Sequence, residues 1–126
     1  DFYLEDYKGQ GTVIELEKPS DEIFSKQERY GLSPKCGEAF GQLIRYCEDT
    51  ISIAHSGERR EIEKIYEIRP LGFLIIGRTK NAEDNKRLKI VNSYFHSVEI
   101  LSYNQLLSRA KTFVEPWLNS NEKQAN

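Results

Sequence analysis

A short, nearly continuous apolar run, Leu71 to Ile76 followed by Gly77, sets the first limit on the fold. The run is far too short to span a bilayer. An apolar run of this length that is closed by a glycine is typical of a β-strand covered on both faces. We therefore expect this segment to lie centrally in a sheet, with helices packed against it.

Two strand-like segments precede this run. The first is the aromatic-rich segment 1–4, a turn lies at 8–11, and the second segment, 12–17, carries β-branched residues. This pattern predicts a β-hairpin. Pro19 lacks a backbone N–H and biases Lys18 towards an extended conformation, so we expect the second strand to end there and a polar crossover, 20–32, to follow.

Ser33 and Pro34 predict the start of a helix, because a serine side chain accepts an exposed N–H and proline at the first helical position removes no hydrogen bond. We expect this helix to run to about Ile53. Its apolar stripe, at helical spacing, consists of Phe40, Leu43, Ile44, Cys47 and Ile51. A separate polar stripe consists of Glu38, Gln42, Arg45, Tyr46 and Asp49.

The charge-dense stretch 55–69 fits either a continuing helix or an irregular insertion. Beyond the central strand we expect a helix from Asp84, a strand from Val98 to Tyr103, and a helix capped by Asn104 whose apolar residues reach Trp117. The segment 119–126 is predicted to be a disordered tail. The resulting order predicts one α/β domain over 1–118, with a mixed central sheet flanked by three helices.

Composition limits the function classes. The chain has 126 residues, and its 18 Lys and Arg against 20 Asp and Glu give a net charge of −2. This size excludes a multidomain enzyme, and this charge gives no overall indication of nucleic-acid binding. A basic rim would have to be local; either that or a solvated helix face accounts for Arg78, Lys80, Lys86, Arg87 and Lys89.

The start of the chain and its two cysteines indicate the extent of the protein and its redox compartment. The chain lacks Met and begins directly in a strand-like segment, so we expect it to be the C-terminal part of a longer protein. No signal peptide or membrane span is recognisable. The two cysteines, Cys36 and Cys47, lack the spacing of a zinc site, and reduced thiols in a cytoplasm are the simpler interpretation.

Strand alternation in the segment 12–18 places two carboxylates, Glu15 and Glu17, on one face. On an ordinary solvent-facing edge, this pair would only aid solubility. Asp1 on the neighbouring strand can supply a third carboxylate. Clustered carboxylates repel one another unless a hard cation neutralises them, so the alternative is a Mg²⁺ or Mn²⁺ site.

A second group lies on the first helix. Gln42 and Tyr46 stand one turn apart and offer neutral hydrogen-bonding groups, and Arg45 beside them has the charge to hold a phosphate. Residues of these types are also common on helix surfaces, so this group alone carries little functional information.

Taken in order, these motifs resemble a known family. The hairpin with Asp1, the strand Val13 to Ser20, the Gln42 to Tyr46 segment, the strand Leu71 to Arg78 and the closing segment Ile100 to Leu107 are similar to the Shedu anti-phage nuclease domain. That domain is a member of the PD-(D/E)XK nuclease superfamily. The likeness runs from Asp1 to about Trp117.

The resemblance implies a restriction-endonuclease-like sheet and a metal-dependent DNA endonuclease. It makes Asp1 and Glu15 the metal-binding carboxylates for Mg²⁺ or Mn²⁺. It also places Leu16 and Glu17 in the metal-binding segment. There the backbone carbonyl of the residue after Leu16 would complete the coordination of the metal. Gln42 and Tyr46 would orient the site or the phosphate. The N-terminal helix of many superfamily members, which adds another acidic ligand, would lie outside this chain.

One departure from the family pattern affects catalysis. The family has a lysine two residues after the first glutamate, where this chain has Glu17, and Lys18 follows on the opposite face. Glu17 would then be an extra ligand or a water-orienting base. Alternatively, Lys18 swings round at the strand end, or the domain has lost catalysis.

Two classes of function therefore stay open. The first is a metal-dependent DNA endonuclease of a bacterial anti-phage system, acting in the cytoplasm on DNA as a homo-oligomer and without a membrane partner. The second is a catalytically inactive nucleic-acid-binding or assembly domain of the same fold.

Overall fold

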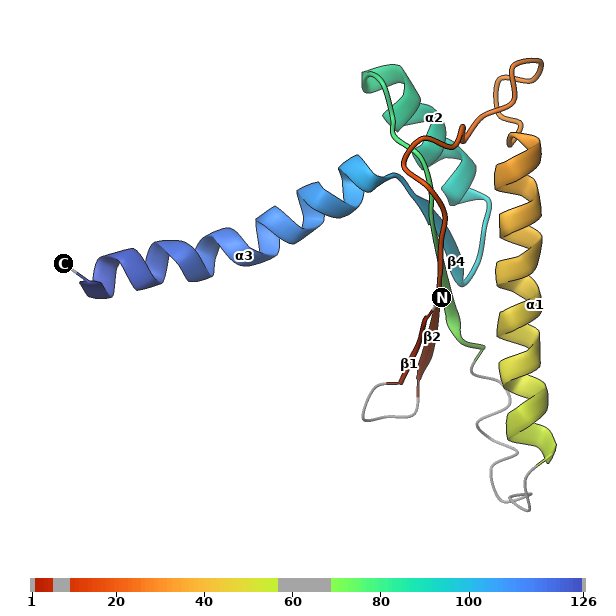
Figure 1. The fold of residues 1–126 in the computed structure, drawn as a ribbon, viewed down its shortest axis with the longest axis horizontal. Coiled ribbons are helices and arrows are strands. Elements are labelled where there is room, and N and C mark those ends of the chain that lie inside the picture. The colour runs from red at the N-terminus through yellow and green to blue at the C-terminus, as the bar shows by residue number, and fades with distance from the viewer. Residues whose placement is uncertain (1, 6–9, 57–68, 126) are drawn as a thin grey trace.

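The computed structural model describes residues 2–5, 10–56 and 69–125 as a sheet with helices (Figure 1). The sheet has four strands in the order β1 (Phe2–Glu5), β2 (Gly11–Leu16), β3 (Leu71–Ile75) and β4 (Val98–Leu101). β1 pairs antiparallel with β2, whereas β2, β3 and β4 run parallel. The expected hairpin, the central position of the apolar strand and the mixed sheet are confirmed.

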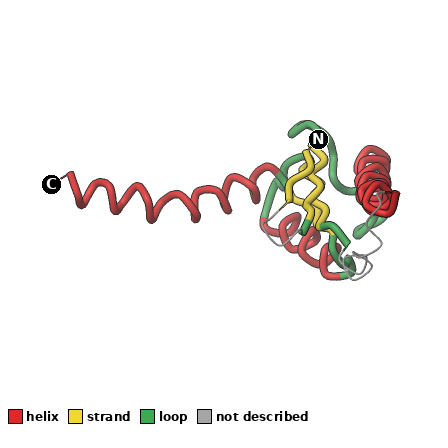
Figure 2. Tube along the Cα trace, turned by 90° about the horizontal axis from the view of Figure 1, so that it is seen from below, coloured by secondary structure: helices red, strands yellow, loops and turns green. Residues whose placement is uncertain are grey.

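Three helices accompany the sheet in the expected order: α1 (Pro34–Ser56), α2 (Ala82–Ser93) and α3 (Tyr103–Ala125). α1 packs against β2 and β3, and α2 packs against β4. Both contribute to one core with Val13, Leu74 and Ile100, which share a face of the sheet. α3 instead projects away from the sheet (Figure 2). No helix in the described ranges is long and apolar enough to cross a membrane.

The start of α1 confirms the role predicted for Ser33. Its side-chain oxygen accepts the Cys36 N–H at 3.0 Å and also donates to the Glu22 carbonyl at 2.6 Å. Ser33 therefore caps α1 and ties it to the crossover. The helix ends at Ser56, a few residues beyond the expected end, and the stretch 57–68 lies outside the described residues.

The buried side of α1 differs in part from the predicted apolar stripe. Cys36, Ala39, Leu43 and Cys47 enter the core, whereas Ile44 is exposed. A side chain at Gly72 of β3 would lie 3.3 Å from both Leu43 and Cys47. The helix therefore approaches the sheet closely, and small residues that hydrophobicity underweights occupy the contact. The prediction was wrong for Ile44.

Burial of β3 also differs from the prediction. Leu74 and Ile76 are fully buried on the face that α1 covers, but Leu71 is exposed and Phe73 is only partly buried. On the opposite face Ile75 is only 5% exposed, so the expectation of a strand covered on both faces is confirmed at the end of the strand and wrong at its start. The start is open because α1 and α2 pack on the same face of the sheet, while α3 projects away from it (Figure 2).

The ends of the later elements are set by side chains. α2 begins earlier than expected, where Asn81 accepts the Asp84 N–H at 2.8 Å. α3 is capped by Ser102, not by Asn104, because Ser102 Oγ accepts the Gln105 N–H while Gln105 Oε1 accepts the Ser102 N–H, each at 3.2 Å.

Asn104 has a different task from the predicted cap. Its side chain accepts the Thr79 N–H at 3.1 Å and donates to the Thr79 carbonyl at 3.2 Å, so it holds α3 to the loop after β3. Beyond Trp117 the backbone stays helical to Ala125, with Pro116 inside the helix. This includes most of the segment 119–126 for which the sequence predicts a tail.

Candidate functional site

Glu15 is a buried carboxylate on the face of the sheet that α1 covers. Alternation along β2 turns Val13 and Glu15 towards α1, as predicted, and the parallel register sets Glu15 beside Leu74. Glu15 is only 3% exposed, and its Oε2 has no hydrogen-bond partner in the described part of the chain. Burial raises its pKa, the Glu17 charge adds to the increase, and Lys35 and Arg45 act in the opposite direction.

Glu17 lies just past the end of β2 and is fixed on both sides by its backbone. Its N–H donates to the Ile75 carbonyl at 2.9 Å, and its carbonyl accepts the Tyr103 hydroxyl. Its carboxylate Oε2 lies 3.1 Å from the Lys35 ammonium on the first turn of α1. Glu17 therefore shares the α1 side with Glu15, as the alternation predicted, and carries its own cation.

The Gln42 and Tyr46 pair is confirmed as a contact. Gln42 Nε2 donates to the Tyr46 hydroxyl at 3.3 Å, and the Arg45 guanidinium lies over the Tyr46 ring at 5.3 Å. Tyr46 also packs partly against the core, so its ring is fixed. Since residues seven and eleven positions apart lie on one side of a helix, Lys35, Gln42 and Tyr46 form a row along α1.

Lys18 is placed differently from these residues. Its side chain is exposed, and its backbone carbonyl accepts the N–H groups of Asp21 and Gly77, both at 3.1 Å. Among the described contacts, none joins the Lys18 ammonium to Glu15 or Glu17. These backbone hydrogen bonds fix Lys18 at the junction between β2 and the crossover.

The predicted third carboxylate, Asp1, lies outside the described residues, although its neighbour Phe2 pairs with Ile14. Leu16 pairs with Ile75 at the end of β2. In residues 2–5, 10–56 and 69–125, no group of three or more His, Cys, Asp or Glu side chains gathers in a metal-binding arrangement. The oxygen donors of Glu15 and Glu17 suit a hard cation, and the unpartnered Oε2 is a ligand atom of the right kind.

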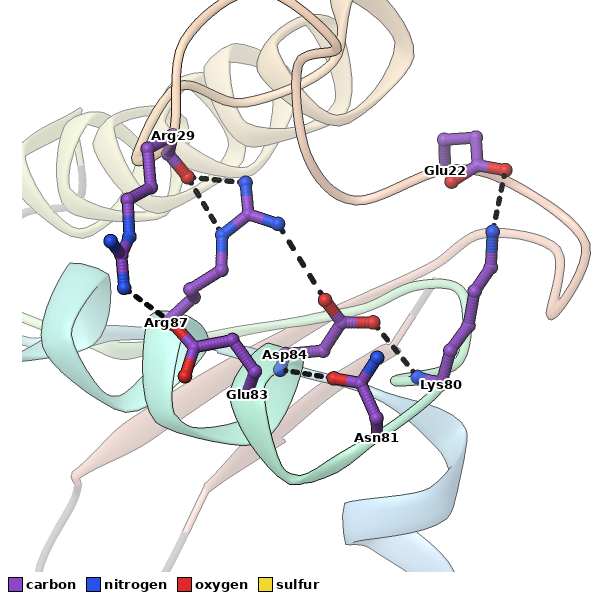
Figure 3. A network of polar contacts seen from close by, with 7 residues as sticks. All are labelled: Glu22, Arg29, Lys80, Asn81, Glu83, Asp84 and Arg87. Carbon is purple, nitrogen blue, oxygen red and sulfur yellow. Dashed lines mark hydrogen bonds and ion pairs between the residues drawn. The ribbon is translucent and has the colours of Figure 1, made fainter.

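Two members of the predicted basic rim have structural partners (Figure 3). Lys80 pairs with Glu22 of the crossover at 3.4 Å. Arg87 pairs with Asp84, donates to the Arg29 carbonyl and lies over the Phe24 ring. Arg87 therefore holds the crossover to α2, and Lys80 holds it to the loop before α2. Arg78, Lys86 and Lys89 are exposed.

Both cysteines are free and buried, so Cys47 packs in the core as predicted. Burial raises the pKa of the Cys36 thiol to about 12, with a further increase from the Glu17 charge. A thiol with so high a pKa stays protonated at neutral pH and is a poor nucleophile. The reactive groups of this face are therefore its carboxylates and cations.

Residues 1–107 match the family described as Shedu protein SduA, C-terminal. The chain belongs to the Shedu family. The matched range contains every candidate site residue and ends within α3, and Shedu membership supports a role in anti-phage defence. No curated protein matches the chain.

Lys35 is the site residue that the Shedu-like motifs did not reveal. It lies far from Glu17 in the sequence, and only the packing of α1 beside the end of β2 brings the two together. The one available signal was its place in the first turn of the helix that follows the carboxylate strand.

Proposed function

We propose that this Shedu domain is a metal-dependent DNA endonuclease with a PD-(D/E)XK fold, acting in anti-phage defence. The observation that carries the proposal is Glu15, a buried carboxylate whose Oε2 has no partner in the described residues. A buried carboxylate oxygen without a hydrogen-bond partner destabilises a fold, and such groups are typical of functional sites.

The topology supports the superfamily assignment. A hairpin is followed by a helix and two parallel strands, and both glutamates lie at the end of the second hairpin strand. The helix that carries Gln42 and Tyr46 comes next in the chain and covers that same face. This is the order of motifs that the sequence resemblance implies.

In this proposal, Glu15 would hold a Mg²⁺ or Mn²⁺ ion, which would supply Lewis-acid polarisation of the scissile phosphate. Gln42 and Tyr46 would bind an oxygen of this phosphate and orient the DNA backbone. Hydrolysis joins a water oxygen to phosphorus and breaks one ester P–O bond; the water loses a proton and the leaving oxygen gains one.

DNA cleavage with matched variants tests this proposal. The parent chain, Glu15→Gln and the remote control Glu115→Gln are incubated with supercoiled and linear DNA, with Mg²⁺, Mn²⁺ or a chelator. We expect metal-dependent cleavage by the parent and the control, with a loss of about 10²-fold or more in Glu15→Gln. A parent without activity, or a Glu15→Gln variant as active as the parent, would overturn the proposal.

A second candidate function, an assembly domain, is favoured by α3. Its apolar side chains recur at helical spacing and stay exposed, with Phe113 at 76% and Trp117 at 69%. The other exposed members are Leu106, Leu107, Val114 and Leu118. Such a stripe is a site for helix pairing, and we propose that it pairs with a second copy of this chain.

The size of the particle tests assembly. Analytical ultracentrifugation of the parent and of the double variant Phe113→Ser/Trp117→Ser gives the oligomeric state of each. We expect a dimer or larger for the parent and a monomer for the double variant. A monomeric parent at high concentration would overturn self-association without affecting the nuclease proposal.

A further inference from the structure

A cation lies beside the second carboxylate of the strand, although the sequence motif has none there. The Lys35 ammonium is 3.1 Å from Glu17 Oε2, and it comes from α1 rather than from β2. The Lys35 charge also acts to lower the pKa of Glu15, against the effect of burial. The position two residues after Glu15 is thus occupied by an acidic residue, Glu17, but the folded chain brings the positive charge of Lys35 next to it.

The Glu17 carboxylate is more buried than those of the exposed ion pairs, and among the described residues only the Arg87–Asp84 pair, at 19% and 17% exposed, is comparably covered. The Glu17 side chain is 14% exposed, whereas both members of the Arg69–Glu48 and Lys80–Glu22 pairs are at least half exposed. An exposed pair contributes little, but a partly buried carboxylate with a fixed backbone holds its partner in one place. The free side of the half-exposed Lys35 ammonium therefore faces solvent from a defined position.

The neighbours of Lys35 indicate what that position serves. Lys35, Gln42 and Tyr46 form one row on α1, the helix that covers the sheet face on which the unpartnered Oε2 of Glu15 is buried. A cation in line with two neutral hydrogen-bonding groups and a buried carboxylate matches the needs of a phosphodiester, whose negative charge grows during hydrolysis.

We propose that Lys35 is the cationic group of this site and replaces the lysine that the strand motif lacks, with Glu17 as the positioning residue that holds it. This inference rests on the proposed nuclease function. It assigns Glu17 the task of carrying the lysine on a neighbouring helix, and it makes Lys18 dispensable for the chemistry.

Relocation of the lysine is the test. Cleavage rates and KM are measured for the parent, Lys35→Ala, Lys18→Ala, the double variant Glu17→Lys/Lys35→Ala and the control Lys26→Ala, which lies on the exposed crossover. We expect Lys35→Ala to lower kcat by about 10²-fold with little change in KM, and Glu17→Lys/Lys35→Ala to regain at least about tenfold of that loss. A merely structural role for Lys35 would not give this rescue.

The outcomes separate the inference from the function on which it rests. A parent that does not cleave overturns both. A parent that cleaves, with Lys35→Ala at the rate of Lys26→Ala, overturns only the role of Lys35, as does a kcat loss in Lys18→Ala larger than that in Lys35→Ala. Circular dichroism melts of each variant, with Lys35→Gln as a second substitution, show whether a loss of activity reflects unfolding.

Discussion

Glu15 stands directly beside Leu74 in the parallel register of β2 and β3, so a carboxylate shares the covered face of the sheet with a fully buried leucine. The next pairing sets Leu74 beside Ile100, which is also fully buried. No apolar core needs a carboxylate in such a row. The position therefore lowers the stability of the fold, and its use has to lie elsewhere.

The first prediction concerns stability and pH. The folded pKa of Glu15 is raised, so the folded state binds a proton more readily than the unfolded chain does. The stability linked to this proton is fully present below the ordinary pKa of glutamate and is lost as pH rises through the folded pKa. At pH 7, Glu15→Gln should be about 1–3 kcal/mol more stable than the parent, and the difference should vanish towards pH 4.

Urea denaturation at both pH values measures this difference, with Glu115→Gln as the exposed control. A Glu15→Gln variant that is less stable than the parent at pH 7 would show that the carboxylate has a partner that stabilises its charged form.

A second prediction concerns Gly77, the residue that ends the central strand region. Its φ is +62°, and an added Cβ would lie 2.4 Å from the Asp21 carbonyl oxygen. Gly77→Ala should therefore cost about 2–4 kcal/mol. The matched control is Gly41→Ala inside α1, where an added Cβ meets nothing within 4 Å, and where alanine should instead stabilise by about 0.5–1 kcal/mol. Thermal melts that rank the two variants the other way round would refute this account.

A third prediction concerns Asn92 at the end of α2. Its amide donates to the Ile100 carbonyl and accepts the Ile100 N–H, both at 2.8 Å, so it pairs with β4 as a neighbouring strand would. Asn92→Ala leaves both backbone groups without this partner and should cost about 1–3 kcal/mol. The exposed Asn85→Ala is the control, and an equal urea midpoint for the two variants would contradict the prediction.

A fourth prediction concerns the Tyr46 hydroxyl, which accepts the Gln42 amide. Tyr46→Phe removes this oxygen but keeps the ring that packs against the core. We expect the free energy of unfolding of the variant to differ from that of the parent by less than about 0.5 kcal/mol. We expect its rate of DNA cleavage to be about tenfold lower. Cleavage at the parental rate would remove Tyr46 from the proposed site.

Local signals in the sequence were sufficient for much of the fold. Ser33 and Pro34 define the start of α1 because capping acts over a few residues. Alternation along β2 was sufficient to place Glu15 and Glu17 on one face, because the side-chain period of a strand is fixed. These inferences needed no knowledge of what packs against each element.

Tertiary contacts decided what the sequence did not. Ile44 is exposed while Ala39 is buried, because the close approach of α1 at Gly72 favours small side chains. Asn104 resembles a cap in the sequence, yet it bonds to Thr79 in a loop that only the fold brings near. Lys35 meets Glu17 for the same reason, since no local pattern joins a helix residue to the strand before it.

Calorimetric measurement of Mn²⁺ binding decides whether Glu15 is a metal ligand. Mn²⁺ is titrated by calorimetry into the parent chain, Glu15→Ala and the control Glu115→Ala, each shown to be folded by circular dichroism. We expect one saturable Mn²⁺ site in the parent and in Glu115→Ala, and the loss of that site in Glu15→Ala. A Glu15→Ala variant that binds Mn²⁺ as the parent does, or a parent that binds none, would contradict it.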